Sequence, residues 1–192
     1  MRNLKYLFFI LLISSCNKES FNEKSIIYEG KGIDNFDIHF LSTDQAKKNI
    51  NDTYKLIHHN HYSTEIFYEN SGISFYYLKS KPNKIFSIST NKNFIGKTSY
   101  GFEMNKMTVK ELFKIYGKPR WHQFYPNQTV SAHYDDLGIY FNIKGLDSIP
   151  YNFDFSSSAN LKTKEIMDKY YSEKYKNQQV QEICVGISNS AF

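Results

Sequence analysis

The chain of 192 residues matches itself when the sequence is shifted so that Phe36 falls on Phe102. The match runs without a gap from residue 36 to residue 75. Phe36-Asp37-Ile38 falls on Phe102-Glu103-Met104, and the stretch Tyr68–Phe75 falls on Tyr134–Phe141. A repeat of this kind indicates one structural unit that is present twice. Because a single unit of this size has a marginal core, we expect the two copies to pack together.

Each copy contains a predicted helix. Ser42 and Gln45 in the first copy, and Thr108 and Glu111 in the second, have the spacing of a capping box, in which the two residues bond each other's backbone N–H. In the second copy, apolar residues then recur at helical spacing, at Val109, Leu112, Phe113 and Tyr116. Gly117-Lys118-Pro119 ends this helix, because glycine caps it and proline prevents its continuation.

Alternating residues predict strands after each helix. In the second copy, apolar residues at 137, 139, 141 and 143 alternate with more polar ones, as they do around residues 73–77 of the first copy. This pattern is typical of a sheet with one buried and one exposed face. The predicted exposed face carries four tyrosines, which are Tyr68, Tyr76, Tyr134 and Tyr140. A third strand is expected at residues 86–88 and again at 151–155.

The expected fold is therefore α+β, with two tandem modules of one helix and three antiparallel strands each. The first module spans residues 26–90 and the second spans residues 91–156. The C-terminal segment, residues 157–192, lies outside the repeat. Within it we predict a helix at residues 161–175 and a last, edge strand at residues 180–185.

The second copy carries a family resemblance. Its helix ends in Tyr116-Gly117-Lys118-Pro119, and a strand pair with Tyr134 and Gly138-Ile139-Tyr140-Phe141 follows. This order resembles the BamE (SmpA/OmlA) outer-membrane lipoproteins, and two such modules in tandem resemble the β-lactamase inhibitor protein. The resemblance covers about residues 36–156, although Asn51-Asp52-Thr53 stands where the first copy should repeat Gly117-Lys118-Pro119. It implies a non-enzymatic module that holds a protein on its open sheet face or adjoining loops.

The N-terminus has the features of a lipoprotein signal peptide at residues 1–15. Arg2 and Lys5 precede the apolar run Tyr6–Ile13, and Ser14-Ser15-Cys16 follows at once. Eight apolar residues are far fewer than the ~20 that span a bilayer as a helix. Ile13-Ser14-Ser15-Cys16 resembles a bacterial lipobox, which implies that Cys16 becomes the first mature residue and carries acyl chains such as palmitate. An ordinary signal peptide with an incidental cysteine is the alternative.

The remaining composition excludes some functions. Residues 16–25 are polar and without periodicity, so they are interpreted as a flexible tether. Removing Arg2 and Lys5 with the signal lowers the formal net charge from +5 to +3, and no long basic run argues for nucleic acid. With Cys16 acylated, Cys184 has no partner for an internal disulfide, and its apolar neighbours favour a buried structural thiol.

An aromatic segment is the best candidate binding site. Residues 120–126 are predicted as a loop that contains Arg120, Trp121, Phe124 and Tyr125. Tryptophan, tyrosine and arginine are enriched at interface hot spots. The predicted protein-binding residues are these four together with Tyr68, Tyr76, Tyr134 and Tyr140 on the sheet. The alternative for the tyrosines is that they only form the sheet, because tyrosine favours strands.

Catalytic chemistry has less support. His58-His59-Asn60-His61 is the densest polar cluster, but a zinc site needs three or four ligands, so a solvated loop before a strand is the preferred interpretation. His133 with Asp135 and Asp136 is more consistent with a strand-end hydrogen bond than with acid–base catalysis. No nucleophile elbow, phosphate loop or dinucleotide motif occurs. We therefore predict no enzyme, no catalytic residues, no metal and no cofactor.

The sequence hypothesis is a lipoprotein of the bacterial envelope, bound by its lipid and placed in the periplasm at the outer membrane, that binds an envelope or secreted protein. The alternative is an immunity or inhibitor lipoprotein that neutralises a toxin or hydrolase. Asn17, after Cys16, is compatible with outer-membrane sorting. An exported location makes a nucleic-acid partner unexpected.

Overall fold

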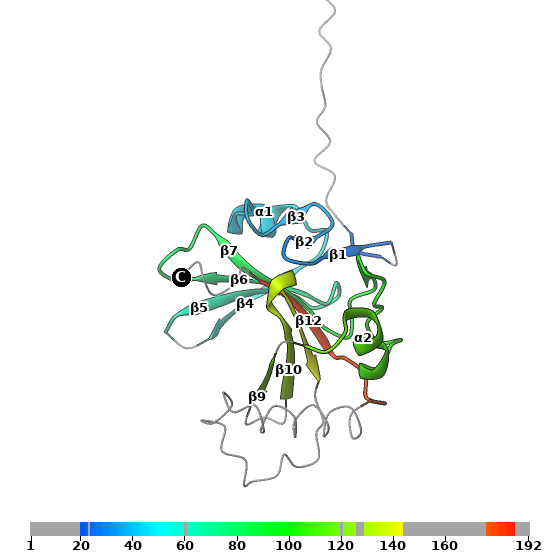
Figure 1. Ribbon diagram of the computed structural model, residues 1–192. Coiled ribbons are helices and arrows are strands. Elements are labelled where there is room, and N and C mark those ends of the chain that lie inside the picture. The colour runs from blue at the N-terminus through cyan, green and yellow to red at the C-terminus, as the bar shows by residue number, and fades with distance from the viewer. Residues whose placement is uncertain are drawn as a thin grey trace, which may run out of the picture.

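The computed structural model describes residues 20–22, 24–59, 61–119, 121–125, 129–143 and 176–186, with only the backbone for residues 121–125 and 129–130. Its largest element is an antiparallel eight-stranded sheet in the order β4-β5-β6-β7-β12-β11-β10-β9 (Figure 1). The strands of its first half are β4 (Tyr54–His59), β5 (Ser63–Tyr68), β6 (Ile73–Leu78) and β7 (Ile85–Thr90). Those of its second half are β12 (Glu182–Gly186), β11 (Ile139–Ile143), β10 (Thr129–Tyr134) and β9 (Trp121–Tyr125).

A smaller sheet and two helices accompany the large sheet. The small sheet has the order β3-β2-β1-β8, and it is built from β1 (Ile26–Tyr28), β2 (Gly32–Ile33), β3 (Phe36–Asp37) and β8 (Lys97–Thr98). The helices are α1 (Thr43–Lys48) and α2 (Val109–Tyr116), and a 3-10 turn, η1 (Asp135–Leu137), joins β10 to β11. Neither helix, nor any other in the described ranges, has the length and hydropathy needed to cross a membrane.

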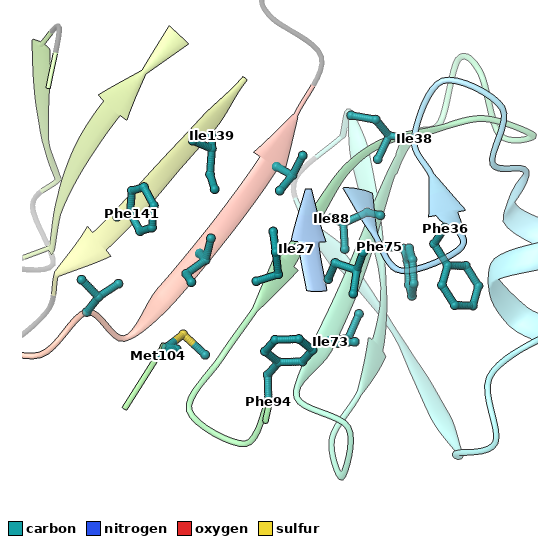
Figure 2. Packing of buried hydrophobic residues seen from close by; sticks show 14 of the residues in the cluster. Ile27, Phe36, Ile38, Ile73, Phe75, Ile88, Phe94, Met104, Ile139 and Phe141 are labelled. Atoms are coloured by element: carbon teal, nitrogen blue, oxygen red, sulfur yellow. The ribbon is translucent and has the colours of Figure 1, made fainter. Parts of the chain in front are cut away.

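The core lies between the large sheet and the small sheet (Figure 2). Ile27 of β1 and Phe36 of β3 approach the large sheet from one side, where Phe75 and Ile88 face them. Phe36 and Phe75 have ring centroids 5.6 Å apart. In the second half of the large sheet, the rings of Tyr116 of α2 and Phe141 of β11 have centroids 5.0 Å apart. Residues of both sheets and of both helices contribute to one cluster of buried apolar side chains.

The two halves of the large sheet use the same strand registers. Tyr68 pairs with Ile73 between β5 and β6, and at the equivalent place in the second half Tyr134 pairs with Ile139 between β10 and β11. The backbone bridge from Ser42 to Lys84 likewise has its counterpart between Thr108 and Gln179. At the centre, β7 pairs with β12 symmetrically around Ser89 and Cys184, since Ile88 pairs with Val185 and Thr90 with Ile183. Strand β12 therefore holds the place in the second half that β7 holds in the first.

The predicted helix ends are confirmed. The backbone N–H of Ser42 donates to Gln45 Oε1 at 2.9 Å, and the backbone N–H of Thr108 donates to Glu111 Oε2 at 2.6 Å. Helix α2 ends at Gly117, whose φ of +74° is easily adopted only without a Cβ atom.

The predicted fold class is wrong. The described chain is mostly β-sheet, and the α+β arrangement of two modules with one helix and three strands each does not hold. Each half contributes a further strand, β4 or β9. All of β9, and His58 and His59 at the end of β4, lie in segments that were predicted as loops. Hydrogen bonding between β7 and β12 then fuses the halves into one sheet. The sequence pattern within a module carries no information about this central pairing.

The C-terminal prediction also needs correction. A strand occurs at Glu182–Gly186, but it lies at the centre of the sheet and not at its edge. Strand β12 occupies the place beside β11 where the predicted meander would put residues 151–155, which lie outside the described residues. The predicted helix at residues 161–175 lies outside them as well.

Candidate functional site

The large sheet has one apolar face and one polar face. Directly paired residues lie on the same face of a sheet. The row Ile66, Phe75, Ile88, Val185, Ile139 therefore crosses the core face. The row Ser74, Ser89, Cys184, Tyr140, His133 crosses the opposite face. We call this opposite side the polar sheet face.

Much of the polar sheet face is nevertheless buried. Ser74, Ser89 and Cys184 are each 5% exposed or less. Burial of Cys184 confirms the expectation of a structural thiol. A polar surface that is already withdrawn from water cannot offer its centre to a protein partner without a rearrangement.

A histidine, a carboxylate and a hydroxyl are joined at one end of this face. Glu65 accepts from Ser74 Oγ at 2.5 Å with one carboxylate oxygen, and its other oxygen lies 2.5 Å from His59 Nε2. The carboxylate thus lies between the imidazole and the hydroxyl. A catalytic triad needs the imidazole next to the nucleophile, so this order does not activate Ser74. The chain of bonds satisfies the buried carboxylate of Glu65 and is structural.

The centre of the face is bonded in the same way. Tyr76 OH lies 3.3 Å from Ser89 Oγ, and Asn142 Nδ2 donates to Glu182 Oε2 at 2.6 Å. Burial raises the pKa of Tyr76. The pKa of Tyr140 is raised mainly by the nearby Cys184, and burial raises it further. Both phenols therefore stay protonated over the physiological pH range.

His133 is neutral at physiological pH. Its ring stacks on Tyr140 with centroids 5.0 Å apart and an interplanar angle of 11°. Burial lowers the pKa of His133 to about 4, although the carboxylate of Asp135, 3.8 Å from Nδ1, acts in the opposite direction. A histidine of this pKa is a poor general base at pH 7.

The histidine cluster does not converge on one point. His58 and His59 belong to β4 and not to a loop, which corrects the sequence interpretation. Being adjacent in a strand, they point to opposite faces, and His58 Nδ1 lies 3.1 Å from Thr64 Oγ1 while His59 bonds Glu65. Within the described ranges no three histidine, cysteine, aspartate or glutamate residues are placed to hold a metal ion.

The exposed feature of the sheet is its edge at β4. All six residues of this strand are exposed, and among the described residues they pair with β5 alone. Three of them are large and apolar, with exposed fractions of 42% for Tyr54, 45% for Leu56 and 38% for Ile57. Tyr54 and Leu56 lie on the core side of the sheet, and Ile57 lies on the polar side. We call Tyr54–His59 the edge strand from here on.

Two predicted binding residues lie in the core. Tyr68 is 0% exposed and Tyr134 is 6% exposed, and they are paired with the core residues Ile73 and Ile139. Their predicted assignment to an exposed face is wrong. The reason is that turns at residues 69–72 and 135–138 separate each tyrosine from the strand that follows it. Alternation of faces holds only within one strand, and these turns restart it. Tyr68 and Ile73, and likewise Tyr134 and Ile139, therefore lie on the same face, although simple alternation along the sequence puts them on opposite faces.

The other predicted residues have different outcomes. Tyr76 and Tyr140 do lie on the polar sheet face, where both are largely buried. Trp121, Phe124 and Tyr125 belong to β9, a strand at the end of the sheet and not a loop. Their side chains, Arg120 and Cys16 lie outside what the structure describes.

Sequence reasoning missed Tyr54, Leu56 and Ile57. The signal was present, because the run Tyr54–His59 is rich in strand-forming residues and a polar turn at residues 60–62 separates it from the next strand. The shift that aligns the two copies also places this run on residues 120–125, which contain β9.

Comparison with known proteins found no match to any protein-family model, to any curated protein or to any solved structure.

Proposed function

We propose that this chain is a non-enzymatic lipoprotein of the bacterial envelope that binds a protein partner along the edge strand. The observation that carries the proposal is the exposure of Tyr54, Leu56 and Ile57 on a strand with no neighbour on its outer side among the described residues. Large apolar side chains grouped on a surface mark interaction sites more often than scattered ones do. Tyrosine in particular is enriched at interface hot spots.

The bonds of the polar sheet face support a binding role and not catalysis. Glu65, Asn142 and Tyr76 are each bonded within the sheet, and no described nucleophile there is paired with a free base. The N-terminal signal and Cys16 support the envelope location. The proposed surface differs from the one that the sequence indicates, because the sheet tyrosines are buried or partly buried and the edge strand is exposed.

Affinity capture from bacterial envelopes tests the proposal. The full-length lipidated protein is used as bait beside a variant with Leu56→Ser and Ile57→Ser. The matched control is Phe40→Ser, because Phe40 is 84% exposed and lies outside the edge strand. We expect the double variant to lose the main captured protein while Phe40→Ser retains it. Capture that survives the double change, with the fold intact by circular dichroism, contradicts the proposal.

A further inference from the structure

The edge strand directs a defined set of backbone groups outward. Lys79 N–H donates to Tyr62 C=O at 2.8 Å, so the backbone of residue 62 points toward β6. In an antiparallel ladder, this direction alternates with each residue. Residues 63, 65 and 67 therefore bond β4, through their partners His59, Ile57 and Lys55. The N–H and C=O groups of Tyr54, Leu56 and His58 are left pointing to the free edge.

Few of the usual protections against strand pairing occur here. Natural edge strands are shortened, bulged, broken by proline or lined with lysine. The edge strand has six residues in unbroken register with β5, from Tyr54 opposite Tyr68 to His59 opposite Ser63. It contains no proline and a single lysine, Lys55. Its backbone is therefore available to another strand.

The side chains define what such a strand should carry. On the core side the edge strand offers Tyr54 and Leu56, which are apolar. On the polar side it offers Lys55, Ile57 and His59, and the strand has no acidic residue of its own. His59 is already bonded to Glu65, so Lys55 is the group that a partner carboxylate can reach. Lys55 donates to Glu69 at 2.6 Å, but both side chains are more than half exposed, so this ion pair is weak and leaves the ammonium group able to donate to a second carboxylate. A second copy of the edge strand would supply no carboxylate.

We propose that an extended segment of the partner protein adds to the edge strand as a further strand of the large sheet. Its alternating side chains are apolar beside Tyr54 and Leu56 on one side, and include an acidic residue beside Lys55 on the other. The backbone groups of Tyr54, Leu56 and His58 supply the hydrogen bonds, as in other cases of peptide recognition by strand addition. This inference rests on the proposed function, since it names how the same surface is used and by what chemistry.

The first test uses two fluorescein-labelled peptides, one of alternating valine and glutamate and one of alternating valine and lysine. Fluorescence anisotropy measures their binding to the full-length lipidated protein in detergent. We expect the glutamate peptide to bind at least about tenfold more tightly, and to weaken as salt is added, because the contacts with Lys55 are screened. Lys55→Glu should reverse the preference. Equal binding of the two peptides, or no binding by either, overturns the inference.

The second test separates backbone from side-chain binding. Leu56→Pro removes an outward N–H without touching the bonds to β5, whereas Leu56→Ala removes only the side chain. Because one backbone hydrogen bond is lost, Leu56→Pro should bind the glutamate peptide about tenfold more weakly than Leu56→Ala does. Thermal melting shows whether the proline variant is folded, and Lys55→Glu remains informative if it is not.

The two proposals can fail separately. If Leu56→Ser with Ile57→Ser abolishes capture of the partner but Leu56→Pro equals Leu56→Ala, the partner docks on side chains, and only strand addition is refuted. If the variant with Leu56→Ser and Ile57→Ser still captures the partner, the proposed function is refuted. Sedimentation that shows a dimer lost on Leu56→Pro identifies a second copy as the occupant and also overturns the inference.

Discussion

The hydroxyl of Tyr68 donates a hydrogen bond to the backbone C=O of Ala46 at 2.6 Å, and so ties strand β5 to helix α1. In the second half, the equivalent Tyr134 makes the same type of bond to the C=O of Gly117, at the end of α2, at 2.8 Å. Burial raises the pKa of both tyrosines, which therefore remain donors. Each helix is held to its half of the sheet by one tyrosine hydroxyl.

Replacing either tyrosine by phenylalanine should lower stability without affecting partner binding. The change leaves a backbone carbonyl without this donor, at an expected cost of about 1 to 2 kcal/mol in the free energy of unfolding. Urea unfolding measures it, with Tyr100→Phe as control because Tyr100 is 57% exposed. The two changes should add, because the bonds lie in different halves of the sheet. No loss of stability in either variant would show that these bonds do not hold the helices.

Gly72→Ala should destabilise the chain more than Gly101→Ala. Both glycines have positive φ, +64° and +89°, so both changes introduce backbone strain. A Cβ on Gly72 would also lie 2.3 Å from the backbone N of Phe94, whereas nothing lies within 4 Å of a Cβ on Gly101. We expect an additional cost of at least about 1 kcal/mol at Gly72, or roughly 2–4 °C in Tm. Thermal unfolding of both variants checks this, and equal melting temperatures would contradict the crowding at Gly72.

His133 should make stability depend on pH between about 4 and 6.5. Its pKa in the folded chain is about 4, below the ordinary value of 6.5, so the unfolded chain binds the proton more tightly. Stability is therefore unaffected above pH 6.5 and falls as the pH decreases toward 4. Between pH 7.5 and pH 5, the free energy of unfolding should fall by roughly 2 kcal/mol more in the wild type than in His133→Gln. Urea unfolding at both pH values measures the difference, and parallel losses in the two proteins would exclude His133 as the cause.

Cys16→Ser should release the protein from the membrane fraction. A fatty acyl chain contributes about 0.8 kcal/mol per buried CH₂ to membrane binding, and we expect no other part of the chain to replace it. Metabolic labelling with radioactive palmitate should label the wild type and not the variant. Membrane association and labelling that persist in Cys16→Ser would exclude lipidation at this residue.

Local features of this chain were predictable because their causes are local. The bonds of Ser42 with Gln45, the helix of Val109–Tyr116 and its end at Gly117 depend on residues a few positions apart. Strands β6 and β11 follow from alternation within a single short segment. The internal repeat likewise anticipated that Tyr68 and Tyr134 have equivalent places, although it did not show which face they occupy.

The site was less predictable, because exposure depends on distant parts of the chain. Tyr76 and Tyr140 lie on the predicted face, yet they are only partly exposed there. Leu56 is exposed because β4 is at the end of the strand order, and nothing in its own sequence distinguishes an edge strand from a central one. The residue types of β4 therefore do not identify it as a site without the strand order.

The helix caps, the alternation within strands and the repeated order of elements follow from the amino-acid sequence, since they arise from interactions between near neighbours. The pairing of β7 with β12 at Ser89 and Cys184, which joins both halves into one sheet, depends on the folded chain, because these strands are far apart in the sequence. The same pairing makes β12 central and leaves β4 as an exposed edge. Backbone hydrogen bonds between strands are the same for almost any sequence, so the choice of neighbour follows from how the whole core packs.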